Sequence, residues 1–174
     1  DAFIRLLSEI SGAPIPERLK SERGRYLDAM IDSHKYNAEG RAVVFGDPDF
    51  VYSMVRLCCE NGLLPVVSAT GTSSPRLLEL LHDEIGKIAT GLFDEEYAVL
   101  DKADFERIEE LALEKKANLF IGSSDARRIE EKHGIPLVRC AFPIHDRVGG
   151  QRISTLGYSG SLNLLDSLTN TLLK

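Results

Sequence analysis

The chain has 174 residues, of which 43% are hydrophobic and 28% charged, with a formal net charge of −6. This composition is typical of one globular domain with a full core. The negative charge, with basic residues interleaved among acidic ones, argues against nucleic acid or an anionic membrane as a partner. Its three cysteines form no CxxC motif and no even-numbered disulfide framework, which favours a reducing, cytoplasmic setting.

The first 40 residues are predicted to be helical. Apolar residues recur at helical spacing over Phe3–Ile10 and again over Pro16–Tyr36. In the longer segment these positions are Leu19, Tyr26, Leu27, Met30 and Ile31. We therefore expect residues 1–40 to form a helical lead-in, and we expect the chain to be a piece of a longer protein.

From residue 41 onward, apolar strands alternate with amphipathic helices. The predicted strands are Ala42–Phe45, Leu64–Ala69, Tyr97–Leu100, Ala117–Ile121 and Ile135–Ala141. The predicted helices are Pro48–Asn61, a segment that includes Leu77–His82, Asp104–Lys115, Ala126–Lys132 and Ser161–Leu173. Nearly continuous apolar strands indicate a parallel sheet covered on both faces. The fold class is therefore α/β: residues 41–174 form a Rossmann-like, doubly wound parallel sheet with helices on both faces, preceded by the helical lead-in.

Polar turns follow three of the predicted strands. They are Gly46-Asp47-Pro48, Gly71-Thr72-Ser73 and Gly122-Ser123-Ser124. Because the carboxyl ends of parallel strands meet at one edge, the backbone N–H groups of these turns should face one crevice, where α/β sheets bind ligands. None of the turns spells a dinucleotide-binding or P-loop motif. Helix capping by Asp47 and its counterparts also explains the residue types.

Asp28 and Asp32 lie four residues apart on the long lead-in helix and so share one of its faces. Like charges at that spacing repel each other unless a positive group lies between them. A hard cation bound by carboxylate oxygens would be such a group. The alternative is a solvated acidic face with Arg25 or Lys35 nearby.

A second candidate is His145-Asp146-Arg147, which follows the last predicted strand. His145 could exchange protons or contact a ligand or cluster. Asp146 and Arg147 could instead cap or pair locally. Cys140 fits a small core residue better than a metal ligand. The sequence has no Ser/His/Asp set at a nucleophile elbow, so no catalytic residue is assigned.

Five separated motifs together resemble the nitrogenase component 1 family. In chain order they are Glu22–His34, Gly46–Val51, Ile121–Ser124, Phe142–Arg147 and Gly157–Gly160. Their order and spacing are similar to the C-terminal domain of a β-type subunit, and the resemblance covers essentially the whole chain. It implies a subunit of three Rossmann-like domains, of which this chain is the third.

The resemblance implies an α2β2 complex with an α-type subunit and a second β-type subunit. That complex reduces dinitrogen to ammonia with electrons from an iron–sulfur reductase driven by MgATP, and the isolated domain is not expected to be active. In the sister branch, the same architecture is a scaffold for iron–molybdenum cofactor biosynthesis. Gly46–Phe50 is closer to the catalytic branch and Asp146–Arg152 to the scaffold. A third hypothesis is a free-standing small-molecule-binding domain that uses the strand-end crevice.

The resemblance also bears on cofactors. The family's iron–sulfur clusters and iron–molybdenum type cofactor lie in regions outside this chain, and Cys58, Cys59 and Cys140 match none of their ligand motifs, so no cofactor is expected here. By the same resemblance, Asp28 and Asp32 help to hold a cation between two β subunits. His145 stands where many β subunits have an aromatic residue. We expect Phe142–Arg147 to be the last core strand and its turn, shaping an interface or the edge of a cofactor cavity that other domains complete.

Overall fold

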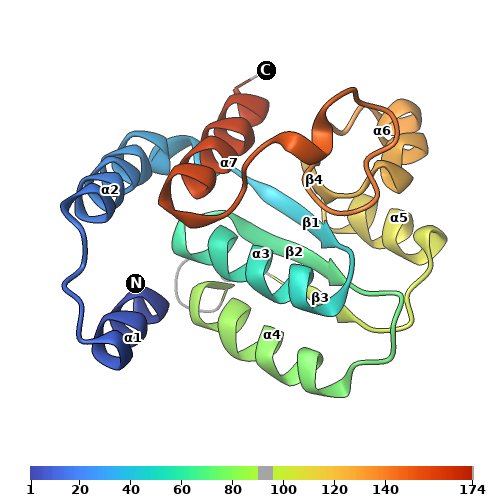
Figure 1. Ribbon diagram of the computed structural model, residues 1–174. Helices are drawn as coiled ribbons and strands as arrows, with labels where there is room; N and C mark the ends of the chain where they lie inside the picture. The colour runs from blue at the N-terminus through green and yellow to red at the C-terminus, as the bar shows by residue number, and fades with distance from the viewer. Residues whose placement is uncertain (90–95, 174) are drawn as a thin grey trace.

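The computed structural model describes residues 1–89 and 96–173, and within these ranges five strands form one parallel sheet. The sheet order is β3-β2-β1-β4-β5 (Figure 1). The strands are β1 (Arg41–Phe45), β2 (Leu64–Ala69), β3 (Ala98–Leu100), β4 (Leu119–Gly122) and β5 (Leu137–Arg139). The order runs outward from β1 in both directions, so the topological switch point lies between β1 and β4. The predicted doubly wound fold is confirmed.

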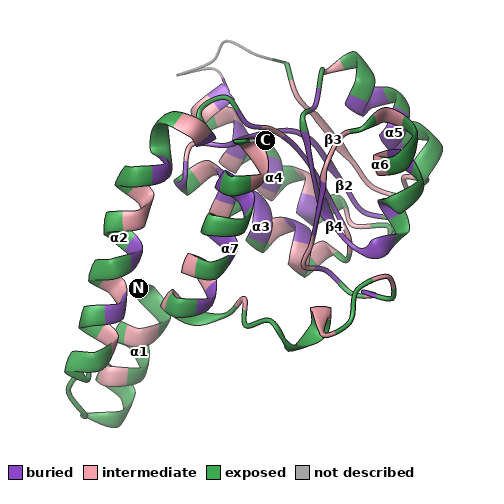
Figure 2. Cartoon of the chain, turned by 90° about the horizontal axis from the view of Figure 1, so that it is seen from above, coloured by how far each residue is buried: buried purple, intermediate pink, exposed green. Residues whose placement is uncertain are grey.

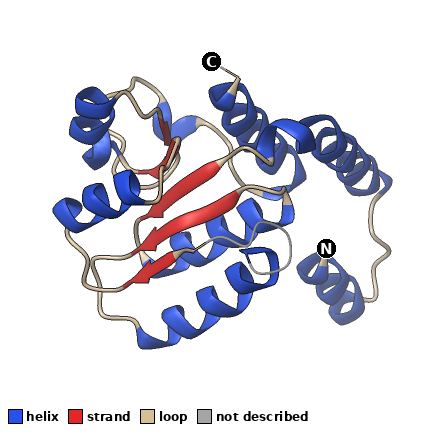
Figure 3. Ribbon diagram, turned by 180° about the vertical axis from the view of Figure 1, so that it is seen from behind, coloured by secondary structure: helices blue, strands red, loops and turns tan. Residues whose placement is uncertain are grey.

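Helices cover both faces of the sheet. Figures 1 and 3 show α3 and α4 on one face, and α5 and α6 on the other. The bounds are α1 (Ala2–Ser11), α2 (Glu17–Asn37), α3 (Pro48–Glu60), α4 (Pro75–Ile88), α5 (Phe105–Glu114), α6 (Arg127–His133) and α7 (Gly157–Leu172), with short 3₁₀ turns η2 (Ser124–Ala126) and η3 (Gly150–Arg152). Among the described residues, no helix is long and apolar enough to cross a bilayer.

The core lies around the central strands, which read as apolar runs because helices cover them on both sides. Every residue of β2 and of β4 is buried, and so is β1 apart from Arg41 (Figure 2). The largest fully buried side chain is that of Phe120 on β4. The observed core therefore lies in the strands that the sequence pattern predicts to be buried.

The helical lead-in is joined to the domain through α2, which packs along α7. A buried polar network fixes this contact: Thr169 Oγ1 donates to Asn37 Oδ1 at 2.9 Å, and Asn37 Nδ2 donates to the carbonyl of Asn61 at 3.2 Å. Asn61 Nδ2 in turn donates to the Tyr26 hydroxyl at 2.9 Å. The described contacts thus make α2 part of the packed structure, while the domain boundary at residue 40 stays a prediction.

The lead-in helices bury less apolar surface than their sequence pattern predicts. Tyr26 is buried, but Ile31 is 76% exposed and Leu27 is also exposed. Helix α1 buries no residue at all. Polar Asn37 and Ser33 take part of the buried face of α2, and a pattern that counts only apolar residues misses this.

The carboxyl-terminal elements differ most from the prediction. Strand β5 ends at Arg139, two residues before the predicted end, because the Cys140 and Ala141 N–H groups both donate to the Gly122 carbonyl. Cys140 lies just beyond the strand and still packs against the core. The expectation that Phe142–Arg147 forms the last core strand and its turn is wrong for the strand, because β5 already ends at Arg139 and Phe142 is exposed. Helix α7 begins at Gly157, four residues before the predicted start.

Candidate functional site

The three predicted turns lie at the same edge of the sheet. They follow β1, β2 and β4, which are adjacent and parallel. Asp47 occupies the N-cap position of α3 with Pro48 in its first turn, as predicted, but the Asp47 side chain makes no capping hydrogen bond. Ser123 does cap, because its Oγ accepts from the Asp125 N–H at 3.3 Å.

An aromatic ring fills the switch point between β1 and β4. Phe45, at the end of β1, packs edge-on against Phe105 and Phe120, with ring centroids 5.3 and 6.4 Å away. A Cβ at Gly122 would lie 2.3 Å from the Phe45 ring, so glycine is what allows the ring to lie there. The position where doubly wound sheets most often bind ligands is thus occupied by the protein's own core.

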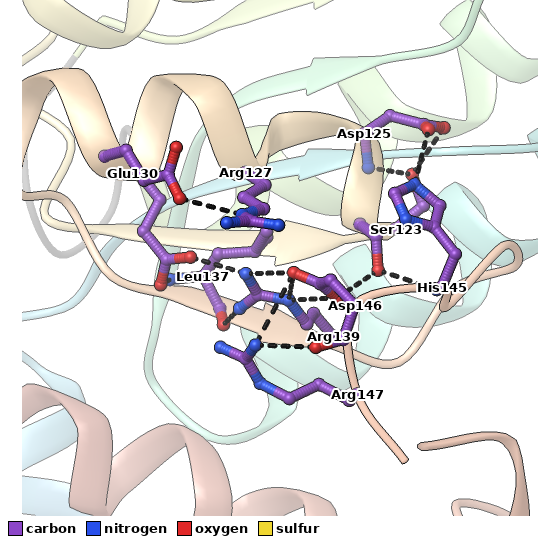
Figure 4. A network of polar contacts seen from close by, with 11 residues as sticks. Ser123, Asp125, Arg127, Glu130, Leu137, Arg139, His145, Asp146 and Arg147 are labelled. Atoms are coloured by element: carbon purple, nitrogen blue, oxygen red, sulfur yellow. Dashed lines mark hydrogen bonds and ion pairs between the residues drawn. The ribbon is translucent and has the colours of Figure 1, made fainter. Parts of the chain in front are cut away.

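At the end of β5 lies a network of charged side chains (Figure 4). Arg139 is its centre, with a side chain only 6% exposed. Its Nε donates to both oxygens of Asp146 at 2.8 and 2.9 Å, and its Nη2 donates to Glu130 Oε2 at 2.6 Å. Its Nη1 donates to the Leu137 carbonyl at 3.0 Å. One guanidinium therefore ties α6 and β5 to the loop that follows β5.

Further bonds hold that loop against η2. Ser124 Oγ donates to Asp146 Oδ1 and accepts from the His145 N–H at 3.1 Å, while the Ser124 N–H donates to the Pro143 carbonyl at 3.0 Å. Arg147 pairs with Asp146, with its Nη1 3.6 Å from Oδ2. The predicted local pairing of Asp146 with Arg147 is confirmed, although Arg139 is the closer partner.

The electrostatics of the network fix its charge state. The hydrogen bonds from Arg139 hold the pKa of Asp146 far below its usual value, against the opposing effect of burial. Burial by itself lowers the pKa of Arg139, but the bonds to Glu130 and Asp146 outweigh it, so that the pKa is raised. Both groups stay charged at neutral pH. This arrangement holds the loop that follows β5 in place.

His145 lies on the exposed side of the same loop. Its Nε2 is 3.7 Å from Asp125 Oδ1, and the other oxygen of Asp125 accepts from Ser123 Oγ at 2.9 Å (Figure 4). An imidazole oriented by a carboxylate could exchange protons or bind a ligand from outside the domain. The structure places this pair at the rim of the strand-end edge, and the binding role of His145 stays a prediction.

Asp28 and Asp32 both lie on the exposed face of α2. Ser33 points the other way: it is buried, and its Oγ donates to the Ala29 carbonyl at 2.7 Å. Within residues 1–89 and 96–173, no three His, Cys, Asp or Glu side chains are placed to hold a metal ion together. The two aspartates could thus supply oxygen ligands to a cation, but a full ligand set would need groups from another chain or domain.

The three cysteines lie in or against the hydrophobic core. Cys58 is fully buried within α3, where burial raises the pKa of its thiol well above the ordinary value. Burial also raises the pKa of Cys59 and of Cys140 to about 12. Cys58 belongs to the hydrophobic core, and the half-buried Cys59 and Cys140 pack against it.

Sequence reasoning singled out Asp146, but it missed Arg139 and Glu130, the partners that hold it. The signal was present in the sequence: Arg139 follows two apolar residues in a strand predicted to be buried. A charged side chain in such a strand requires an ionic partner, because an unpaired buried charge is costly. That reasoning would have predicted an acidic partner near the strand end.

Comparisons with known proteins agree on one family. Residues 1–173 match the family described as nitrogenase component 1 type oxidoreductase. Among curated relatives, the nitrogenase molybdenum-iron protein beta chain of Methanothermobacter marburgensis is 41% identical over 100% of this chain and 37% of its own length. The protein of the same name from Frankia alni is 34% identical over 99% of this chain and 32% of its own.

A solved structure supports the same assignment. The protein titled "Nitrogenase Cp1 at pH 6.5" superimposes with a TM-score of 0.89 at 30% identity, over 99% of this chain and 37% of that one. The chain therefore spans about a third of the length of the proteins that it matches. A family match across nearly the whole chain, with a common backbone, establishes that this chain belongs to the nitrogenase component 1 type oxidoreductase family.

Proposed function

We propose that this chain is the third, C-terminal domain of a β-type nitrogenase subunit. In the proposed assembly, the full subunit forms an α2β2 complex with an α-type partner and reduces dinitrogen to ammonia with electrons from an ATP-dependent iron–sulfur reductase. The proposed setting is the cytoplasm. The iron–sulfur clusters and the iron–molybdenum type cofactor would be held by parts of the complex outside this chain, since Cys58, Cys59 and Cys140 match none of the family's ligand motifs.

One observation carries this proposal: the match to molybdenum-iron protein beta chains extends over the whole chain but over only 37% of the relative in Methanothermobacter marburgensis. The filled switch point also argues against the free-standing small-molecule-binding hypothesis, because Phe45 occupies the crevice which that hypothesis requires.

The test is the activity of the complete complex. The full gene product containing these residues, co-expressed with the α-type partner, should co-purify with it and reduce acetylene when reductase and MgATP are added. Omission of the reductase should abolish the activity. A gene that encodes only these 174 residues, or a full-length protein that binds no α-type partner, would refute the proposal.

A second candidate function is the scaffold role in iron–molybdenum cofactor biosynthesis. The segment Asp146–Arg152 favours it, because this segment resembles the scaffold branch more than the catalytic one. The acetylene assay separates the two functions. A complex that assembles with both subunits and carries a cofactor precursor, yet reduces no acetylene with reductase and MgATP, would be the scaffold.

For the acidic pair, we propose that Asp28 and Asp32 supply part of a cation site between two β-type subunits. Both are exposed one helical turn apart, and carboxylate oxygens suit a hard cation such as calcium. Calcium or iron(II) titration of the full-length oligomer should give lower occupancy in Asp32→Asn than in the unchanged protein. Equal occupancy in both would refute the site. We also propose that His145 borders a cofactor cavity that other domains complete.

A further inference from the structure

A cavity of about 540 Å³ lies where α1 meets α2, α3 and α7. Phe3 of α1, Leu27 of α2 and Leu57 of α3 are among the apolar side chains that line it. Figure 2 shows α1 next to the first turns of α2, and a bond between Arg23 and Asp1 joins the two helices. The volume falls within the range of about 300–1,000 Å³ that is usual for small-molecule sites, whose walls are mostly apolar.

Helix α1 is held beside this cavity by Asp1, the residue at its N-terminus. Arg23 Nε donates to both oxygens of Asp1, at 2.9 and 3.0 Å, and the Tyr158 hydroxyl donates to Asp1 Oδ1. All three residues line the cavity. These bonds join α1 to α2 and α7. They also pair the Arg23 guanidinium with a carboxylate, so its positive charge at the cavity wall is compensated.

A second cavity of about 250 Å³ adjoins the first, because Met30 and Glu60 line both. Asn61 also lines the second cavity and is only 3% exposed. Its Nδ2 donates to the Tyr26 hydroxyl at 2.9 Å and to the Leu57 carbonyl at 2.7 Å, whereas its Oδ1 has no hydrogen-bond partner among the described residues. An unsatisfied buried acceptor is costly, so a bound group with N–H donors would be stabilised here.

The acidic groups at these walls favour a cation. Glu60 lies at the junction of the two cavities, where Arg56 Nη2 donates to its Oε1 at 3.3 Å and both side chains are about half exposed. Such an exposed pair is weak, and the Glu60 carboxylate keeps the capacity to accept from another donor. Glu22 adds a second carboxylate to the larger cavity. His34 lines the smaller cavity and offers an acceptor nitrogen when its imidazole is neutral.

We propose that the two adjoining cavities form a binding site for a small organic cation, namely a primary amine that carries an apolar body. The ammonium group donates to the Glu60 carboxylate and to Asn61 Oδ1, and the apolar body lies in the larger cavity. An ammonium has three N–H donors, which match these acceptors. The inference is independent of the proposed function, because it rests on residues other than Asp28, Asp32 and His145.

The test is isothermal titration calorimetry on the full gene product that contains these residues, in its native assembly. The probe is 4-phenylbutylamine, and 4-phenylbutan-1-ol and 4-phenylbutyrate carry the same ring with a neutral or an anionic end. The amine should bind with a Kd of about 1 mM or lower, which is ordinary for a ligand of this size. The alcohol should bind about tenfold more weakly, because its hydrogen bonds lack the assistance of a charge. The butyrate should give no measurable binding.

Two variants locate the site. Glu60→Gln should weaken binding of the amine about fivefold while leaving the affinity for the alcohol unchanged, which also shows that the variant is folded. Glu110→Gln is the matched control, because Glu110 pairs with Arg107 on α5 and is exposed to a similar extent. Met30→Trp should fill both cavities and abolish binding of the amine and of the alcohol, whereas Leu113→Trp on the exposed side of α5 should leave both unchanged.

Several results would overturn the inference. Absence of saturable binding of the amine would show that the assembled protein has no such site. Equal affinities for the amine and the alcohol would remove the role of the charge. Amine binding that is unchanged in Glu60→Gln, or in a folded Met30→Trp variant, would mean that the amine binds elsewhere. None of these results affects the co-purification and acetylene assays, so the proposed function is judged separately.

Discussion

Replacing Arg139 by Met tests whether the strand-end network stabilises the domain. Met keeps much of the side-chain length but removes every donor, leaving Asp146 and Glu130 without their guanidinium partner. Loss of one partner from a buried ion pair costs about 3–5 kcal/mol, because the remaining charge is buried and uncompensated. Glu130 is about a quarter exposed, and Arg147 stays 3.6 Å from Asp146. We therefore expect the lower end, a loss of about 3 kcal/mol.

The assay is urea unfolding followed by circular dichroism, which compares the free energy of unfolding of Arg139→Met with that of the unchanged chain. Arg107→Met is the control, because Arg107 pairs with Glu110 on the surface with both side chains more than half exposed, and such pairs contribute less than about 1 kcal/mol. The double variant Arg139→Met/Asp146→Leu should recover part of the loss. A loss below about 1 kcal/mol in Arg139→Met would refute the reasoning, since the network would then not behave as a buried one.

Three further predictions concern other parts of the fold. The side chains of His133 and Lys132 lower the pKa of Glu109 to about 2. The contribution of the Glu109 carboxylate to stability should therefore be complete above pH 4.5 and be lost as the pH falls toward 2. Glu109→Gln should reduce the pH dependence of unfolding in that window, and an unchanged acid-unfolding profile would contradict this. Gly122→Ala should destabilise by about 1–3 kcal/mol through its clash with Phe45, and should cost less in a Phe45→Leu background. Asn37→Ala should cost about 2 kcal/mol by leaving buried polar groups unpaired, measured by thermal unfolding against the exposed control Asn170→Ala.

The sequence predicts a strand or helix well where the local residue pattern alone determines that element. Strands β1 and β2 are found within one residue of their predicted bounds, because both are covered on both faces and read as uninterrupted apolar runs. Helix α5 is equally clear, since Asp104 caps it and its apolar residues keep helical spacing. In these segments local propensity and tertiary packing agree.

Prediction fails where a tertiary contact sets the outcome. The end of β5 depends on the Gly122 carbonyl, which accepts from two successive N–H groups, and no pattern within residues 135–141 encodes that. Similarly, the ring of Phe45 fills the crevice that was expected at the strand ends. An apolar residue at the end of a buried strand is compatible with an open crevice and with a filled one, so the sequence does not distinguish the two. Spacing along the chain carries no information about which ring fills which space.

The structure separates groups that are already satisfied from groups that are not. Arg139 and Asp146 use their hydrogen-bonding capacity on each other and on neighbouring elements, and Phe45 fills the space between β1 and β4. The predicted site residues that lie exposed are Asp28 and Asp32 on α2 and His145 in the loop after β5. A catalytic centre needs several converging groups, and Asp28 and Asp32 lie on α2 whereas His145 lies after β5, so these candidate residues belong to two separate surfaces.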